Sequence, residues 1–139
     1  MNVLYTAEAT AWAGRNGRAA SSDGILDVNL VVPKELGGPG GDGTNPEQLF
    51  AAGYAACFHS ALLLVAKGDG LDTEGSAVTA QVGIGPNDAG GFGLAVTLEV
   101  EIPNLDHDAA TQLVEKAHQV CPYSNATRGN VDVQLEVLS

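Results

Sequence analysis

The chain has 139 residues, of which 45% are hydrophobic and 17% are charged, and its formal net charge is −11. This length fits one domain, which we expect to span residues 1–139 and to bury a core without metals or disulfides. So acidic a chain is repelled by a phosphate backbone, which argues against nucleic acid as a partner. The N-terminus has no basic leader with an apolar run behind it, so we expect no signal peptide and a cytoplasmic location.

The first third of the chain predicts two strands and a glycine-rich loop. Residues 4–12 read as a strand and residues 14–17 as a turn. Residues 25–32 alternate apolar and polar side chains, as a half-buried strand does. We expect these two strands to form a hairpin with a wide turn. Residues 33–43 contain five glycines and two prolines, a composition typical of a loop.

A long apolar helix is predicted to follow this loop and to stop at Gly68. The sequence Thr-Asn-Pro-Glu at residues 44–47 matches both a capping box and an Asn N-cap with proline at the first helical position. Residues 49–66 are apolar enough to suggest a membrane span, but their alanine content and polar interruptions fit a buried soluble helix better. Apolar residues lie on every face, so the helix must be enclosed all round. One small sheet cannot enclose it, whereas a second copy of the chain can.

The second half predicts an α+β arrangement with mostly antiparallel strands. Residues 78–84 and 92–102 alternate and form a hairpin, and residues 131–138 form a last strand. Between them, residues 106–120 predict an amphipathic helix that Asp106 opens, with one face made of Ala109, Leu113, Ala117 and Val120.

Two cysteines are the main candidates for chemistry. Cys57 lies in the middle of the long helix, where a free cysteine is often only a small buried hydrophobe. Cys121 precedes Pro122, so the pair can cap a short helix through Thr127, and the free N–H groups there can lower a thiol pKa. The cysteines are 121 − 57 = 64 positions apart, so they form no CxxC motif. In a cytoplasmic chain such a pair suits a dithiol–disulfide cycle, although structural roles remain open for both.

Nearby histidines raise the alternative of a metal site made of Cys57, His59, Cys121 and His118. Residues two apart on a helix point away from each other, so Cys57 and His59 do not easily share a metal ion. We therefore expect no bound metal.

Cations are rare in this chain, and two of its three arginines, Arg15 and Arg18, flank a glycine turn. Such residues are usually solvated, but an arginine beside Cys57 would stabilise its thiolate. Glu47 is either a favourable acid at the helix start or the partner that aims an arginine through a bidentate pair. Glu47 lies about 15 Å from Cys57 along one straight helix. A shared site therefore needs a long arginine to bridge part of that span, or groups from two chains.

Four segments carry a family resemblance: GRNGRAASSDGILDV, ELGGPGGDGTNPEQLFAAGYAACF, GGFGL and AHQVCPYSNATRGNVDV. Together they resemble the organic hydroperoxide resistance family, within the superfamily of osmotically inducible protein C (OsmC). The resemblance covers nearly the whole chain. It implies an OsmC-like α+β fold in which antiparallel sheets wrap around a long buried central helix. It also implies an intertwined homodimer with two equivalent sites at the subunit interface.

The resemblance further implies a role for each site residue. Cys57 matches the family's peroxidatic cysteine, Cys121 its resolving cysteine, Arg15 its catalytic arginine and Glu47 the acid that orients this arginine. The implied activity is reduction of organic hydroperoxides, including fatty-acid hydroperoxides, to alcohols. Electrons would come from an external dithiol, dihydrolipoamide or a lipoylated protein, and no cofactor would be bound.

Apolar residues near Cys57 are candidates for the walls of a substrate pocket, although each is equally a core residue: Phe50, Tyr54, Phe58 and Phe92. Three alternative functions stay open at this point. The first is a peroxidase of the OsmC branch with broader peroxide tolerance. The second is a non-catalytic two-cysteine redox sensor, and the third is a dimeric binding domain whose buried thiols are unreactive at neutral pH.

Overall fold

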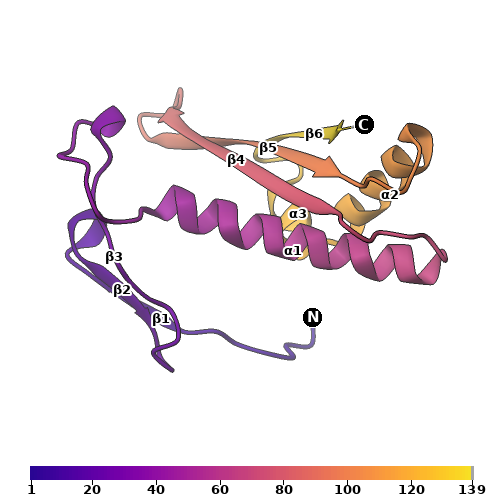
Figure 1. Cartoon of the computed structure of the whole chain (residues 1–139). Coiled ribbons are helices and arrows are strands. Elements are labelled where there is room, and N and C mark those ends of the chain that lie inside the picture. The colour runs from indigo at the N-terminus through magenta and orange to yellow at the C-terminus, as the bar shows by residue number, and fades with distance from the viewer. Residues whose placement is uncertain (139) are drawn as a thin grey trace. The chain divides into compact units, whose positions relative to one another are not determined.

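Two three-stranded sheets and three α-helices make up this α+β fold, seen in a computed structural model that describes residues 1–138 (Figure 1). The chain divides into two compact units, Met1–Leu49 and a second one that begins at Phe50. The helix α1 (Pro46–Gly68) starts in the first unit and continues in the second. The expectation of one domain over residues 1–139 stays a prediction.

The sheet of the first unit contains a strand that the sequence pattern missed. Its strands are β1 (Ala9–Trp12), β2 (Arg18–Ser21) and β3 (Asp27–Asn29), antiparallel in the order β1-β2-β3. The predicted direct hairpin between residues 4–12 and 25–32 is therefore wrong, because β2 lies between its two strands. β2 has only four residues to pair with, which limits β1 to Ala9–Trp12. Two short 3-10 helices, η1 (Gly14–Asn16) and η2 (Lys34–Leu36), complete this unit.

The helix α1 spans Pro46–Gly68, in agreement with the prediction. The Asn45 Oδ1 accepts a hydrogen bond from the Gln48 N–H at 2.8 Å, so Asn45 is the cap and proline the first helical residue. The alternative capping box is not formed. The Thr44 hydroxyl donates to the Gln48 side chain instead, and the Glu47 carboxylate is engaged elsewhere.

The second sheet combines the predicted hairpin with one parallel strand. β4 (Ala77–Pro86) and β5 (Phe92–Glu101) pair antiparallel, whereas β6 (Asp132–Leu138) pairs parallel with β5. Parallel neighbours need a crossover connection, and here α2 (His107–Val120) and α3 (Pro122–Thr127) provide it. This ladder departs from the antiparallel pairing expected for the sheets.

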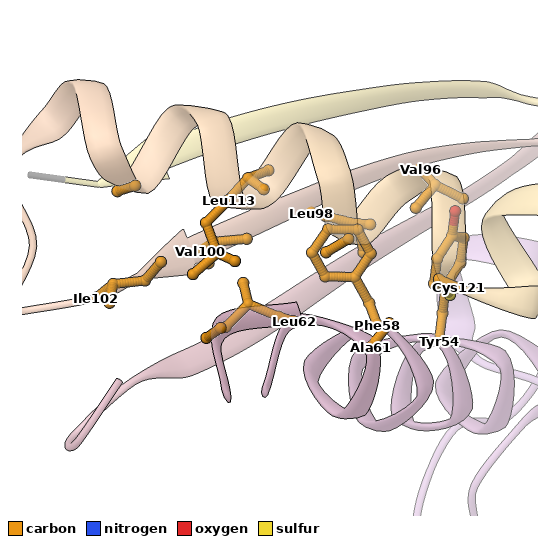
Figure 2. Packing of buried hydrophobic residues seen from close by; sticks show 14 residues of the cluster. Tyr54, Phe58, Ala61, Leu62, Val96, Leu98, Val100, Ile102, Leu113 and Cys121 are labelled. Atoms are coloured by element: carbon orange, nitrogen blue, oxygen red, sulfur yellow. The ribbon is translucent and has the colours of Figure 1, made fainter. Parts of the chain in front are cut away.

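The core of the second unit lies between one face of this sheet and the helices α1 and α2 (Figure 2). On α1 the buried side chains recur at helical spacing, so they form one stripe toward the sheet. On β5 they alternate, as predicted. The largest fully or nearly fully buried side chains of this core are Tyr54, Phe58, Leu62, Val96, Leu98, Val100, Leu113, Val114 and Cys121.

Two leucines of α1 lie outside this buried stripe and are exposed. Leu63 and Leu64 are 42% and 66% exposed, so the enclosure that the sequence calls for is incomplete in a single copy. Completion by a second copy stays a prediction. Among residues 1–138, α1 alone has the length and apolar composition of a membrane span. The core helix of a soluble protein passes the same test, and the buried stripe on α1 identifies it as such a helix.

The helix α2 begins as predicted but buries a slightly different face. The Asp106 Oδ1 accepts a hydrogen bond from the Ala109 N–H at 2.8 Å and caps the helix. The predicted inward position of Val120 is wrong, since this side chain is 45% exposed. The buried residues are Ala110, Leu113, Val114 and Ala117.

Removing this cap should weaken the fold by a measurable amount. Asp106→Ala leaves the Ala109 N–H without its partner, so we expect the free energy of unfolding to fall by about 1 kcal/mol. Urea unfolding followed by circular dichroism measures the loss. Asp106→Asn keeps a capping oxygen and is the control, expected to stay within a few tenths of a kcal/mol of the parent. Equal losses in both variants would contradict the capping role.

Candidate active site

The two cysteines meet in the second unit although 64 positions separate them in the chain. The Cys121 thiol donates to the Cys57 Sγ at a sulfur–sulfur distance of 3.5 Å, and both thiols are free. Cys57 projects from α1 and is partly buried, whereas Cys121 is fully buried. The structure therefore brings together the two residues that carried the sequence-based hypothesis.

The position of Cys121 follows from the proline after it. Cys121 leaves the helical conformation, with φ −60° and ψ 123°, and stands as the C-cap of α2 and the N-cap of α3. Its Sγ accepts a hydrogen bond from the Ser124 N–H at 3.4 Å. This junction, as predicted, offers the sulfur a backbone donor.

The surroundings of Cys57 do not by themselves favour a thiolate. Burial raises the pKa of the Cys57 thiol, a backbone hydrogen bond from Tyr123 opposes this, and the contact with Cys121 adds to the rise. The net direction is upward because loss of water destabilises the charged sulfur. A reactive Cys57 therefore needs a cation from outside its own helix.

The first unit contains a cation with a fixed orientation. The Arg15 Nη1 and Nη2 donate to the Glu47 Oε1 and Oε2 at 2.7 and 3.1 Å. The bidentate geometry holds the guanidinium plane, and the Glu47 hydrogen bond raises the pKa of Arg15, which stays charged. The side chain of Arg15 is 37% exposed and that of Glu47 14%. The predicted pairing of these two residues is thus present.

The neighbouring arginine has a different engagement. Arg18 donates through Nε and Nη2 to both carboxylate oxygens of Asp27, each at 2.7 Å. Its guanidinium also lies 5.2 Å from the centroid of the Trp12 ring. Arg18 is therefore part of the small sheet, which separates its role from that of Arg15.

The four candidate pocket residues differ in their exposure. Tyr54 and Phe58 are fully buried and Phe50 is half-buried, whereas Phe92 is 74% exposed at the start of β5. One more aromatic residue, Tyr123, lies with Phe50 and Tyr54. The ring centroids are 6.1 Å apart for Phe50–Tyr54 and for Phe50–Tyr123, and 5.7 Å for Tyr54–Tyr123. We call these three residues the aromatic cluster.

The close approach of Tyr123 depends on a glycine of α1. A Cβ atom on Gly53 would lie 3.2 Å from the Tyr123 hydroxyl oxygen and 3.3 Å from its ring. Gly53 thus leaves the space in which the Tyr123 ring lies. A glycine within a long helix was the one sequence signal for this contact, because such a position often marks close packing.

A buried set of polar side chains behind the cysteines was not predicted. The Ser124 hydroxyl bonds to the Tyr54 hydroxyl and to the His118 Nδ1, each at 2.8 Å, and the Thr127 hydroxyl lies 3.1 Å from that of Tyr54. We call Tyr54, His118, Ser124 and Thr127 the hydroxyl network. Sequence reasoning considered His118 only as a metal ligand.

The two histidines near the cysteines both have hydrogen-bond partners in the protein. His59 pairs with the Ser76 hydroxyl at 2.9 Å, and His118 pairs with Ser124. Within residues 1–138 no group of three or more His, Cys, Asp or Glu side chains gathers in a way that could hold a metal ion. The expectation that the chain binds no metal stays a prediction.

Comparison with known proteins now places this geometry in a family. The family model described as OsmC-like protein matches residues 38–136. The chain belongs to the OsmC-like family. Among OsmC-like relatives, an organic hydroperoxide resistance protein of Xanthomonas axonopodis pv. citri is 60% identical over 134 residues, covering 96% of this chain and 94% of the relative.

Solved OsmC-like structures agree with the fold described above. An organic hydroperoxide resistance protein of Elizabethkingia anophelis, crystallised with thiocyanate bound, superposes with a TM-score of 0.94 at 55% identity, covering 99% of this chain and 98% of the other. OhrB of Bacillus subtilis, also an organic hydroperoxide resistance protein, gives a TM-score of 0.89 at 49% identity, covering 98% and 100%. The predicted OsmC-like α+β fold is confirmed.

Proposed function

We propose that this OsmC-like chain is a thiol peroxidase that reduces organic hydroperoxides to alcohols, with Cys57 as the attacking and Cys121 as the resolving cysteine. The observation that carries the proposal is the 3.5 Å contact between the two sulfurs. The names of the relatives, organic hydroperoxide resistance proteins, support the substrate class.

The first chemical step oxidises Cys57. Its thiolate attacks one oxygen of the hydroperoxide, an S–O bond forms and the O–O bond breaks. The alkoxide takes up a proton and leaves as the alcohol, and Cys57 becomes a sulfenic acid. The peroxide gains two electrons and the sulfur loses two.

The second step forms a disulfide. The Cys121 sulfur attacks the sulfenic sulfur, an S–S bond forms, and the S–O bond breaks. The departing hydroxide takes the thiol proton of Cys121 and leaves as water. An external dithiol then restores both thiols through a mixed disulfide and becomes a disulfide itself. We propose dihydrolipoamide or a lipoylated protein as this reductant, on the strength of the family resemblance.

In this proposal the Arg15 guanidinium stabilises the Cys57 thiolate, and Glu47 orients the guanidinium. Burial raises the pKa of Cys57, and a guanidinium brought close to the sulfur opposes that rise. Glu47 fixes the orientation of the guanidinium through its two hydrogen bonds. We propose that this cation serves Cys57 in a homodimer, and the exposed Leu63 and Leu64 of α1 support assembly of two copies.

The substrate's alkyl group would bind to apolar surface next to Cys57. Phe50 and Tyr123 of the aromatic cluster are the two members that are not fully buried. They are therefore the best candidates for this contact, and the fully buried Tyr54 packs against both rings. Phe58 is fully buried in the core. The exposed Phe92 would line a pocket only if a second copy covers it.

Steady-state assays test the activity directly. The full chain is mixed with cumene hydroperoxide and, in parallel, with dihydrolipoamide, thioredoxin or glutathione as the reducing system. We expect many turnovers per subunit with dihydrolipoamide. Consumption that stops at one equivalent of peroxide per subunit would instead favour the redox-sensor alternative. Thiols that stay unreactive at neutral pH would favour the binding domain.

Replacing the resolving cysteine should separate the two steps. In Cys121→Ser we expect Cys57 to react once with peroxide and then to stall as sulfenic acid or to oxidise further to sulfinic acid. Mass spectrometry after dimedone trapping identifies these species. Steady turnover by Cys121→Ser at the parent rate would show that Cys121 does not resolve the sulfenic acid.

A further inference from the structure

The hydroxyl network joins the three helices that surround the cysteines. Tyr54 belongs to α1, His118 to α2, and Ser124 and Thr127 to α3. Tyr54 and Ser124 have no exposed surface, and Thr127 is only 5% exposed. A buried hydroxyl is costly unless it is hydrogen-bonded. Here every member has a partner, so the network is satisfied as it stands.

The direction of each hydrogen bond follows from counting protons. The Thr127 hydroxyl donates its one proton to the Ser124 carbonyl oxygen at 3.2 Å, so it accepts from Tyr54. The Tyr54 proton is then used, so Ser124 donates to Tyr54. Ser124 in turn accepts from the His118 Nδ1–H. Burial, and then the charge of Arg128, lower the pKa of His118, which favours the neutral ring. In a neutral ring that donates through Nδ1, the single ring proton is on Nδ1.

This network lies one helical turn away from the two sulfurs. Tyr54 and Cys57 are three residues apart on α1, and Cys121 and Ser124 are three residues apart across the start of α3. Residues at this spacing share a helix face. The helices α1 and α3 are thus connected twice, by the Tyr54–Ser124 hydrogen bond at 2.8 Å and by the sulfur contact at 3.5 Å.

We propose that Ser124 is a positioning residue for disulfide formation. Together with Tyr54 and His118, its hydroxyl holds the start of α3 against α1, so that the Cys121 sulfur stays beside that of Cys57. Its backbone N–H also donates to the Cys121 Sγ at 3.4 Å. Ser124 therefore positions the Cys121 sulfur in two ways, through the hydrogen bonds of its side chain and through that of its main chain.

Preorganisation of this kind changes how readily the dithiol closes. A disulfide requires the sulfurs at about 2.05 Å and with a restricted torsion. A pair already held in contact loses less freedom on closing than a pair on independently moving helices. The inference rests on the proposed function for its place in the peroxidase cycle, but the closing equilibrium itself does not depend on peroxide.

The decisive measurement is the equilibrium between the Cys57–Cys121 dithiol and its disulfide in mixtures of reduced and oxidised dithiothreitol. Acid quenching, alkylation and mass spectrometry give the oxidised fraction of the full chain. We expect Ser124→Ala to reduce the equilibrium constant for disulfide formation roughly tenfold, which corresponds to the net contribution of one of the two buried hydrogen bonds that its hydroxyl makes. Tyr54→Phe, which keeps the ring and removes the hydroxyl, should shift the equilibrium in the same direction.

Ser76→Ala is the matched control. It also removes a serine hydroxyl that bonds a histidine ring, at 2.9 Å from the His59 Nε2. Neither Ser76 nor His59 belongs to the hydroxyl network. We expect its equilibrium constant to equal that of the parent chain. If Ser124→Ala does not fold, Tyr54→Phe alone decides. Parent-like equilibrium constants in the folded variants of Tyr54 and Ser124 would overturn the inference.

A second arm keeps this inference separate from the proposed function. The parent chain and Ser124→Ala are mixed with cumene hydroperoxide, and sulfenic acid at Cys57 is trapped with dimedone. Equal rates of loss of the free Cys57 thiol are expected at early times. More trapped sulfenic acid, and later more sulfinic acid, is expected in the variant, because its Cys121 resolves the sulfenic acid more slowly. Absence of any peroxide-driven oxidation of Cys57 in the parent chain, as sulfenic acid or as the Cys57–Cys121 disulfide, would refute the peroxidase, while the dithiothreitol equilibrium would still decide the role of Ser124.

Discussion

Cys57→Ser is expected to abolish peroxide reduction, with a loss on the order of a thousandfold or more in turnover. A serine hydroxyl remains protonated near neutral pH and forms no counterpart of the sulfenic acid, so neither chemical step proceeds. Cumene hydroperoxide consumption with excess dihydrolipoamide measures the effect. The substitution changes one side-chain atom at a half-buried position of α1, so the fold should persist.

Cys121→Ser is the control for Cys57→Ser, because it changes the same atom in the other member of the pair. It should retain one rapid reaction with peroxide, whereas Cys57→Ser should retain none. A thermal unfolding curve of each variant checks that loss of activity is not loss of fold. Full multiple turnover by Cys57→Ser would exclude Cys57 as the attacking residue.

Local sequence signals predicted the ends of the helices well. Three helices begin at predicted capping residues, which are Asn45 before Pro46, Asp106, and Cys121 before Pro122. These interactions join residues within a few positions of each other. They therefore depend on the local sequence and little on the rest of the fold.

Strand pairing was less predictable because its partners are distant in sequence. The segment Arg18–Ser21 has four residues and one buried side chain, Ala20, so it shows no clear alternation, yet it is the central strand of its sheet. β6 alternates as predicted, but alternation does not distinguish a parallel from an antiparallel neighbour. Both outcomes depend on tertiary contacts that a local pattern does not contain.

In the candidate site, too, some residues had a local sequence signal and others depend on tertiary contacts. Two sequence signals indicated the pairing of Arg15 with Glu47. Cations are scarce in this chain, and Glu47 is an acid in the first turn of a helix. Ser124 gave no signal of its own, since a serine in a short helix is ordinarily exposed. Its importance appears only when the fold brings Tyr54 and His118 to its hydroxyl.

Removal of Arg15 is the second large effect that we expect. In Arg15→Ala burial still raises the pKa of Cys57, but the proposed opposing cation is gone. Thiolate is the reactive form, so the iodoacetamide alkylation rate at neutral pH should fall and its pH profile should move to higher pH. We expect peroxide turnover to fall on the order of a hundredfold, as for other removed charge-stabilising groups.

Arg18→Ala is the matched control for Arg15, because Arg18 belongs to the same turn region but is paired with Asp27. It should leave the alkylation profile of Cys57 in place. Glu47→Gln keeps an acceptor for Arg15 without the charge and should cause a smaller loss than Arg15→Ala. Identical profiles in Arg15→Ala and the parent chain would refute the role of this guanidinium.

Mixing two inactive variants determines which chain supplies the arginine. If Arg15 acts across the proposed dimer, a mixed dimer of Arg15→Ala and Cys57→Ser contains one site with both residues intact. Random exchange should then restore about a quarter of the parent activity, because half of the dimers are mixed and each has one working site of two. If Arg15 acts within its own chain, no site in any dimer has both residues, and mixing restores nothing. The two geometries thus predict opposite results from the same pair of proteins.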